Sequence, residues 1–120
     1  MYYVWMFNIP HSTKVYIAIQ PVDMRKGFNG LYALVTEKLG GKPLSGSLFV
    51  FTNKSRNRVK ILYWDGSGLW VFAKRLEEGR FSWPAKAQRG KKLRIEPAAL
   101  SMLLAGIELK QGMKKAWYEA

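Results

Sequence analysis

The sequence predicts an α+β fold, in which an antiparallel β-sheet meander of about four to six strands carries two short helices packed mainly on one face. Three observations predict this class. Several short runs are rich in β-branched and aromatic residues, which favour strands. The turn sequence Asp65-Gly66-Ser67-Gly68 joins two of these runs, as in a tight hairpin. Two other segments place apolar residues at spacings of three and four, which indicates amphipathic helices.

The first two expected elements lie between residues 14 and 39. Residues 14–20 form a β-branched and aromatic run that ends before Pro21, so a strand is expected there. A helix is expected at 23–39, with Asp23 as its N-cap and Gly40 just beyond its end. Glycines near its start cost about 1 kcal/mol each relative to alanine, so a later start at Asn29 is an alternative. The apolar positions of this helix are Met24, Phe28, Leu31, Val35 and Leu39.

Further strands are expected at 47–53, 58–64 and 69–75, because these runs are too short for helices and too apolar for loops. A turn at 77–79 leads to a short strand at 80–83, which Pro84 ends. Residues 85–92 form a polar, basic connector, and residues 91–95 are expected to add an edge strand. The sheet therefore occupies most of the middle of the chain.

The hairpin at 58–75 has a predictable register if Gly66 and Ser67 are its two loop residues. Lys60 then faces Ala73 across the hairpin. We expect the helices to cover the aromatic side, so that the other side stays partly exposed. The aromatic side carries Val59, Ile61, Tyr63, Trp70 and Phe72, and the exposed side carries Arg58, Lys60, Leu62, Trp64, Leu69, Val71, Ala73 and Arg75.

A second helix is expected from Pro97, since proline suits the first helical position. Its apolar face consists of Leu100, Leu103, Leu104 and Ile107. A chain of 120 residues supports one core, so residues 1–120 are interpreted as a single domain. Residues 110–120 are expected to be a loosely held basic tail.

Composition excludes several classes of protein. The chain has no cysteine and one histidine, His11, so neither thiolate nor histidine-rich metal sites are expected. No run approaches the length of about 20 apolar residues that a membrane span needs. The N-terminus lacks the basic leader and cleavage site of a signal peptide. We therefore expect a cytoplasmic, nucleoid-associated protein without membrane contact.

Positive charge is concentrated between residues 54 and 94. This stretch holds 12 of the 20 Lys and Arg residues but only three of the eight acids, and the chain has a formal net charge of +12. Such a surface attracts a polyanion, and Trp64 or Trp83 could stack on bases. The alternative is a solvated charged face beside core aromatics. The candidate nucleic-acid-binding cations of this stretch are Arg56, Arg58, Lys60, Lys74, Arg75 and Arg80.

Arg25 and Lys26 are a second candidate site. Cations in the first turn of the expected helix would oppose its macrodipole unless an anion occupied that helix end. The alternative is that both side chains reach away to carboxylates such as Glu37 or Glu77.

Catalytic residues are not expected. The acids show no spacing typical of a metal site for phosphoryl transfer, and neither a phosphate loop nor a nucleophile elbow is present. No cofactor is expected. A nuclease assembled from scattered acids is the weakest alternative.

Three segments closely resemble a known family: DMRKGFNGL at 23–31, SGSLFVFTNKSRNRVKILYWDGSGLWVFAKRLEEGRFSWP at 45–84, and IEPAALSMLLAGI at 95–107. The family is the small accessory protein, the second open reading frame product or TnpB, of bacterial insertion sequences of the sixty-six family. The resemblance covers roughly residues 6–109. It implies a role in transposition beside a separate, larger transposase that carries the catalytic acids.

This sequence departs from the family pattern at two places. Asn29 stands where the family commonly has aspartate, which removes one acid from a basic segment. The pattern begins near Met6, so residues 1–5 are interpreted as an upstream extension. The resemblance supplies no catalytic residues, and nucleic-acid binding is inferred from charge.

Two functional hypotheses follow. In the first, the protein binds the element's DNA, or less favourably RNA, and about eight neutralised phosphates would give a slope of log affinity on log salt near −7. In the second, it is a protein-interaction module that docks to the transposase without DNA contact. A dimer would suit paired element ends.

Overall fold

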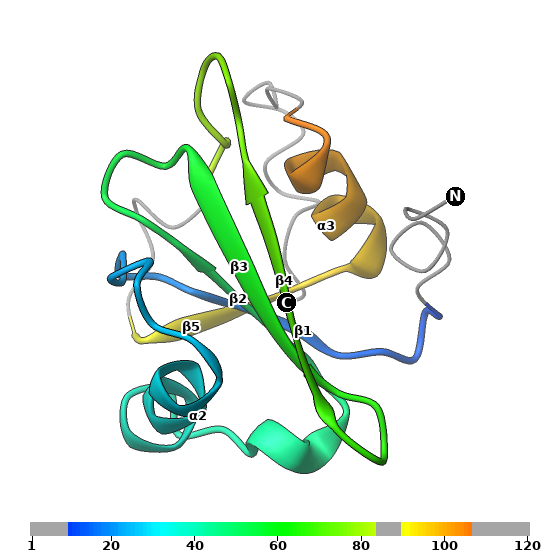
Figure 1. Cartoon of the computed structure of the whole chain (residues 1–120). Helices are drawn as coiled ribbons and strands as arrows, with labels where there is room; N and C mark the ends of the chain where they lie inside the picture. Colours follow the sequence, from blue (N-terminus) through cyan, green and yellow to red (C-terminus); the bar gives the residue numbers. More distant parts are fainter. Residues whose placement is uncertain (1–9, 84–89, 107–120) are drawn as a thin grey trace.

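The computed structural model describes residues 10–83 and 90–106. These residues form the α+β arrangement that the sequence predicts, with a sheet and two helices (Figure 1). The strands are β1 (Val15–Ala18), β2 (Leu48–Thr52), β3 (Arg58–Trp64), β4 (Leu69–Arg75) and β5 (Lys92–Ile95), and the helical elements are α2 (Phe28–Glu37), η1 (Pro43–Ser45) and α3 (Pro97–Leu104).

The strands follow the order β4-β3-β2-β1-β5 in a mostly antiparallel sheet. The exception is the parallel pairing of β1 with β2, in which Val15 lies beside Leu48. The expected meander is wrong at this point, because α2 lies in the connection and returns the chain to the end where β1 began. β5 pairs antiparallel with the other edge of β1, as its expected role as an edge strand requires. β1 is therefore a central strand.

The two helices lie on opposite sides of the sheet (Figure 1). One core contains α3, through Leu100 and Leu103, with Val59 and Ile61 of β3. The other contains α2, through Leu31 and Val35, with Phe49, Phe51 and Leu62 of the sheet. The expectation that both helices pack on one face is wrong. The reason is that β2 is buried along its whole length, so both of its faces need a cover.

α2 begins at Phe28, close to the alternative start at Asn29 and five residues later than the 23–39 helix that the apolar spacing favours. Asp23 accepts a hydrogen bond of 2.8 Å from the backbone N–H of Arg25 and holds a turn there instead of capping the helix. Gly27 takes the N-cap position without a side-chain cap. The segment from Asp23 to Lys26 is thus a loop that precedes the helix.

The predicted hairpin register is confirmed. Trp64 pairs with Leu69, Lys60 with Ala73, and Arg58 with Arg75. Asp65 closes the loop by accepting hydrogen bonds of 2.8 and 2.9 Å from the backbone N–H groups of Ser67 and Gly68. The two-residue loop therefore fixes which side chains share a face.

Residues 80–83 do not form the expected strand. Phe81 donates its backbone N–H to the carbonyl of Arg56 at 2.6 Å, and the Trp83 indole donates to the Ala18 carbonyl at 3.0 Å. Both aromatic side chains are buried in the core on the α3 side. The segment is held over this core by a backbone hydrogen bond to the loop at Arg56 and by a hydrogen bond from the Trp83 side chain to the last residue of β1.

Some expectations lie outside the described residues: the extension at 1–5, most of the connector at 85–92, the place of Ile107 on the apolar face of the second helix, and the tail at 110–120. In the ranges that the structure does describe, neither helix is long and apolar enough to traverse a lipid bilayer.

Candidate nucleic-acid interface

Arg58 and Arg75 face each other directly across β3 and β4. Backbone hydrogen bonds from the Asp65 N–H to the Gly68 carbonyl and from the Leu76 N–H to the Asn57 carbonyl lie at the two ends of this ladder. Because hydrogen-bonded and non-hydrogen-bonded pairs alternate between them, the two arginines form a non-hydrogen-bonded pair, the kind with the closer side chains. Like charges at directly opposite positions destabilise a sheet. An anion placed between them would remove that cost.

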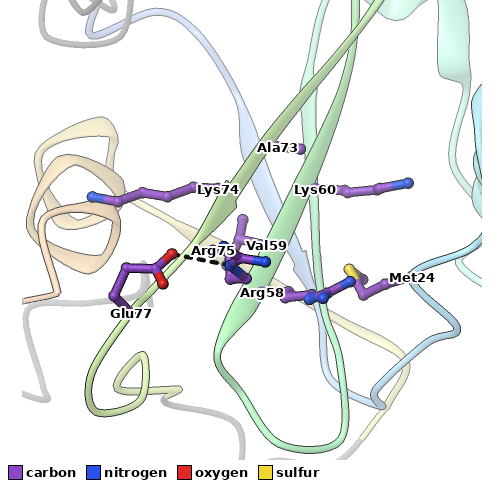
Figure 2. A pocket seen from close by; sticks show the side chains of 8 residues that line it. All are labelled: Met24, Arg58, Val59, Lys60, Ala73, Lys74, Arg75 and Glu77. Carbon is purple, nitrogen blue, oxygen red and sulfur yellow. Dashed lines mark hydrogen bonds and ion pairs between the residues drawn. The ribbon is translucent and has the colours of Figure 1, made fainter.

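The α2 side of the hairpin carries this arginine pair and Lys60, since all three alternate with residues of the other core. An open hollow of about 460 Å³ lies at this end of the hairpin, and Figure 2 shows its side chains. Its floor includes the exposed Ala73, whose small side chain leaves space opposite Lys60. The lining residues are Met24, Arg58, Val59, Lys60, Ala73, Lys74, Arg75 and Glu77.

The two arginines differ in their partners. Arg75 Nε donates to Glu77 Oε2 at 3.0 Å, in an ion pair whose side chains are 59% and 76% exposed. Exposed pairs of this kind contribute little to stability, so Arg75 can exchange Glu77 for a phosphate. Arg58 is exposed and makes no side-chain hydrogen bond or ion pair with the residues that the structure describes. Its guanidinium is thus available to a ligand.

Arg56 and Arg80 extend the positive region beyond the strand ends. The hydrogen bond between the Phe81 N–H and the Arg56 carbonyl places the two segments side by side. Arg56 has a φ of 58°, in the left-handed region that non-glycine residues rarely adopt. Amide and carbonyl groups of Asn53 and Asn57 bond across this turn and hold it in place. The four arginines 56, 58, 75 and 80 are hereafter called the arginine end of the hairpin.

Lys60 and Lys74 do not belong to one common surface. They point in opposite directions from neighbouring strands (Figure 2). Lys60 Nζ donates to the carbonyl of Lys26 at 2.8 Å on the α2 side. Lys74 Nζ donates to the carbonyl of Leu104 at 2.7 Å, at the C-terminal end of α3, where a cation is favourable. The expectation of a single basic face is wrong for Lys74, and both ammonium groups have structural partners.

Arg25 and Lys26 lie before α2, so the premise of a helix-end anion site is wrong. Arg25 forms an ion pair with Asp23, with Nη2 to Oδ2 at 2.7 Å. Hydrogen bonds from Arg25 lower the pKa of the Asp23 carboxyl to about 2. The side chain of Arg25 is nevertheless 91% exposed. The backbone carbonyl of Lys26, rather than its ammonium, makes the contact with Lys60.

The three tryptophans in the described part of the chain separate into core and surface residues. Trp83 is buried and bonded to the backbone, so the expectation that it could stack on a base is wrong. Trp64 is half-buried at the hairpin tip, away from the arginine end. Trp70 is 51% exposed and stacks on Phe72 with ring centroids 5.7 Å apart. Trp70 on β4 is therefore the most exposed of these three tryptophans.

Sequence reasoning missed Met24 and Ala73 as lining residues of the hollow. The predicted register already placed Ala73 opposite Lys60, so a small residue between cations was the available signal. Met24 had no such signal, because its position depends on the loop before α2. Among residues 10–83 and 90–106, no group of three or more His, Asp or Glu side chains is arranged to hold a metal ion.

Comparison with known proteins gives one family and two relatives. A family model described as IS66 Orf2 like protein matches residues 13–114. Uncharacterized protein y4jC of Sinorhizobium fredii (strain NBRC 101917 / NGR234) is 39% identical over 103 residues, which cover 86% of each chain. Uncharacterized protein y4hO of the same strain is 44% identical over 97 residues, which cover 81% of the present chain and 83% of the relative. No solved structure matches the chain significantly.

Proposed function

The chain belongs to the IS66 Orf2-like family of insertion-sequence accessory proteins, and on that premise we propose that it is a non-catalytic accessory protein for transposition that binds nucleic acid through the arginine end of the hairpin. DNA is the favoured ligand, because an insertion sequence moves as DNA, and RNA is the alternative. The element's transposase would supply the chemistry.

One observation carries the proposal: Arg58 and Arg75 occupy a close, directly opposite pair. A fold that served only to bury its core would gain by replacing one of them with a neutral residue. A backbone phosphate between the two guanidinium groups accepts hydrogen bonds from both and reverses the repulsion. Arg56 and Arg80 would contact neighbouring phosphates, since their segments are joined by a backbone hydrogen bond.

The partners of the other cations reduce the expected number of phosphate contacts. Lys60 and Lys74 donate to carbonyls, and Arg25 is paired with Asp23. The proposal assigns phosphate contacts to the four residues of the arginine end, so the slope of log affinity on log salt is about −3 to −4 instead of −7. Contacts of this type position a duplex and do not read its sequence.

A second candidate function is docking to the transposase, which two exposed aromatics on α2 favour. Phe28 is 52% exposed and Tyr32 is 37% exposed, and they lie one helical turn apart. Exposed aromatics of this kind are typical anchors of protein interfaces. On this alternative the positive charge would be secondary.

The experiment compares binding of a labelled terminal fragment of the element by wild type, Arg58→Gln/Arg75→Gln, and Lys38→Gln/Lys42→Gln. Both variants lose two charges, and Lys38 and Lys42 are exposed cations that do not belong to the arginine end. We expect the arginine variant to lose at least tenfold in affinity and the lysine control to lose much less. Equal losses would mean that only net charge matters. Absence of binding by wild type, with transposase captured through Phe28 and Tyr32, would favour the docking function.

A further inference from the structure

The outer side of β4 is a free strand edge in the part of the chain that the structure describes. β4 is the terminal strand of the sheet and is seven residues long. Along the β3–β4 ladder, hydrogen-bonded pairs alternate with non-hydrogen-bonded pairs, from the bonded pair Asp65–Gly68 to the bonded pair Asn57–Leu76. Residues 70, 72 and 74 therefore direct their backbone groups to β3. The N–H and C=O groups of Leu69, Val71, Ala73 and Arg75 therefore point outward, ready to pair with another strand.

Features that normally protect an edge strand from pairing with another strand are weak on β4. Lysines protect edges when their charge projects into the path of an incoming strand. Lys74 is instead held by the Leu104 carbonyl, and Arg75 is paired with Glu77. Trp70 presents a half-exposed ring on the same strand, stacked on Phe72. An apolar edge of this length, to which no strand of residues 10–83 or 90–106 pairs on the outer side, is a docking surface for a strand.

We propose that the occupant of this edge is a second copy of the chain, paired antiparallel through its own β4 about a two-fold axis at Phe72. This register pairs Leu69 with Arg75 of the second copy and Val71 with its Ala73. It uses all the outward backbone groups of 69, 71, 73 and 75, whereas a shift of two residues in either direction leaves an end unpaired. Because every outward backbone group of this edge finds a partner on the same edge of a second copy, the edge is self-complementary.

Side chains also match in this register. Trp70 lies opposite Lys74 of the second copy in a non-hydrogen-bonded pair, so the aliphatic stem of Lys74 can pack on the indole ring while its ammonium keeps the Leu104 carbonyl. Phe72 meets its own copy. Each molecule has a net charge of +12, which opposes association. In this register the cationic end of each strand lies opposite apolar residues of the other, so like charges do not face each other along the edge. The contact is small, and the dimer is therefore reversible.

The dimer does not depend on the proposed function, although it would place two Arg58–Arg75 pairs on one continuous sheet. A two-fold axis perpendicular to the sheet keeps both pairs on the same face. Arg75 of one copy lies opposite Leu69 of the other, so the two pairs are separated by about 20 Å along the strand direction. Oligomeric state is measured without nucleic acid, so its result is distinguishable from that of the binding experiment.

The register is tested with single cysteines, which the chain permits because it contains none. Trp70→Cys and Lys74→Cys are purified separately and oxidised mildly, alone and as an equal mixture, in salt that screens the net charge. We expect the mixture to form a disulfide-linked dimer at least tenfold faster than either variant alone. Comparable rates in all three samples, or no crosslink in the mixture, would overturn the register.

The edge itself is tested by removing one outward donor. Ala73→Pro deletes an N–H that does not bond to β3, and proline is tolerated on an edge strand at such a position. Ala73→Thr keeps the donor and is the control. By sedimentation we expect wild type and Ala73→Thr to approach twice the 13.8 kDa chain mass at high concentration. We expect Ala73→Pro to dissociate with at least a tenfold higher constant. A monomeric wild type, or a dimer that the folded proline variant retains, would overturn the proposal.

Discussion

The indole N–H of Trp70 donates to the Asp65 carboxylate at 2.7 Å, which ties the edge strand to the tip of its own hairpin. The same carboxylate accepts hydrogen bonds from the backbone N–H groups of Ser67 and Gly68 and from the Ser67 hydroxyl. The Trp70 bond is the largest cause of a pKa of Asp65 well below its usual range. One exposed carboxylate therefore organises the loop that fixes the hairpin register.

Asp65→Ala is expected to lower the urea midpoint of unfolding, because it removes every one of these acceptors. Ser67→Ala removes only the hydroxyl and serves as the control, with a much smaller shift expected. Equal midpoints for Asp65→Ala and wild type would show that the loop is held by glycine conformation alone.

The free energy of unfolding should also depend on pH in the acid range through the Asp65 carboxyl. A carboxyl whose folded pKa lies below its unfolded value of about 3.9 stabilises the fold above that pH, and the contribution is lost as pH falls toward the folded pKa. We expect the urea midpoint of wild type to be constant from pH 7 to 5 and to fall between pH 4 and 2. Asp23, with a pKa of about 2, contributes in the same window and in the same direction. The Asp65→Asn variant should lose less over that window than wild type, and an identical acid profile would contradict this assignment.

Lys60→Met is expected to loosen the loop before α2, because it removes the donor to the Lys26 carbonyl while keeping an apolar stem. A half-buried charged hydrogen bond of this kind contributes about 1.5 to 3 kcal/mol. The measurement is the rate of tryptic cleavage after Arg25 and Lys26 under native conditions, which should rise several-fold. Lys38→Met, at an exposed position, should leave that rate unchanged.

Gly41→Ala tests the packing of the chain after α2. A Cβ at this position would lie 2.9 Å from Cε1 of Phe49 and 3.2 Å from Cγ1 of Val35. Since Phe49 is buried, overpacking should lower the free energy of unfolding by about 1 to 3 kcal/mol. Gly68→Ala has open space around it and should cost less than Gly41→Ala. A Gly41→Ala protein as stable as wild type would mean that the Phe49 ring can move aside.

The arginine pair should affect folding and binding in opposite directions. Arg58→Gln removes a like-charge contact with Arg75, so at low salt it should raise the free energy of unfolding by a few tenths of a kcal/mol. The same variant should bind DNA more weakly. Thermal unfolding at low and high salt checks this, since screening should abolish the gain. Destabilisation at low salt would show that the two side chains are not repulsive neighbours.

The sequence predicted best what local chemistry decides. Asp65-Gly66-Ser67-Gly68 fixed the hairpin register, and through it the faces of Arg58, Lys60 and Arg75. The pairing of β1 was beyond such reasoning, because a long connection can return the chain to either end of a strand. The placement of the helices did leave a signal. Four consecutive apolar residues, Leu48 to Phe51, are typical of a strand buried on both faces.

The candidate site was predicted in part for a related reason. The alternation of side chains along a strand predicts on which side of the sheet a lysine side chain lies, but not which carbonyl its ammonium contacts. The acceptors for Lys60 and Lys74 are 34 and 30 residues away in the chain. Those carbonyls are placed by the loop before α2 and by the end of α3, so only the assembled fold shows that these lysines are structural.

The salt dependence of DNA binding tests the central claim most directly. Fluorescence anisotropy across a salt series should give wild type a slope of about −3 to −4 for log affinity against log salt. Arg58→Gln/Arg75→Gln should reduce the magnitude of that slope by about 2, because two phosphate contacts are lost. If the slope of the double variant equals that of wild type, the arginine end of the hairpin is not where the phosphates bind.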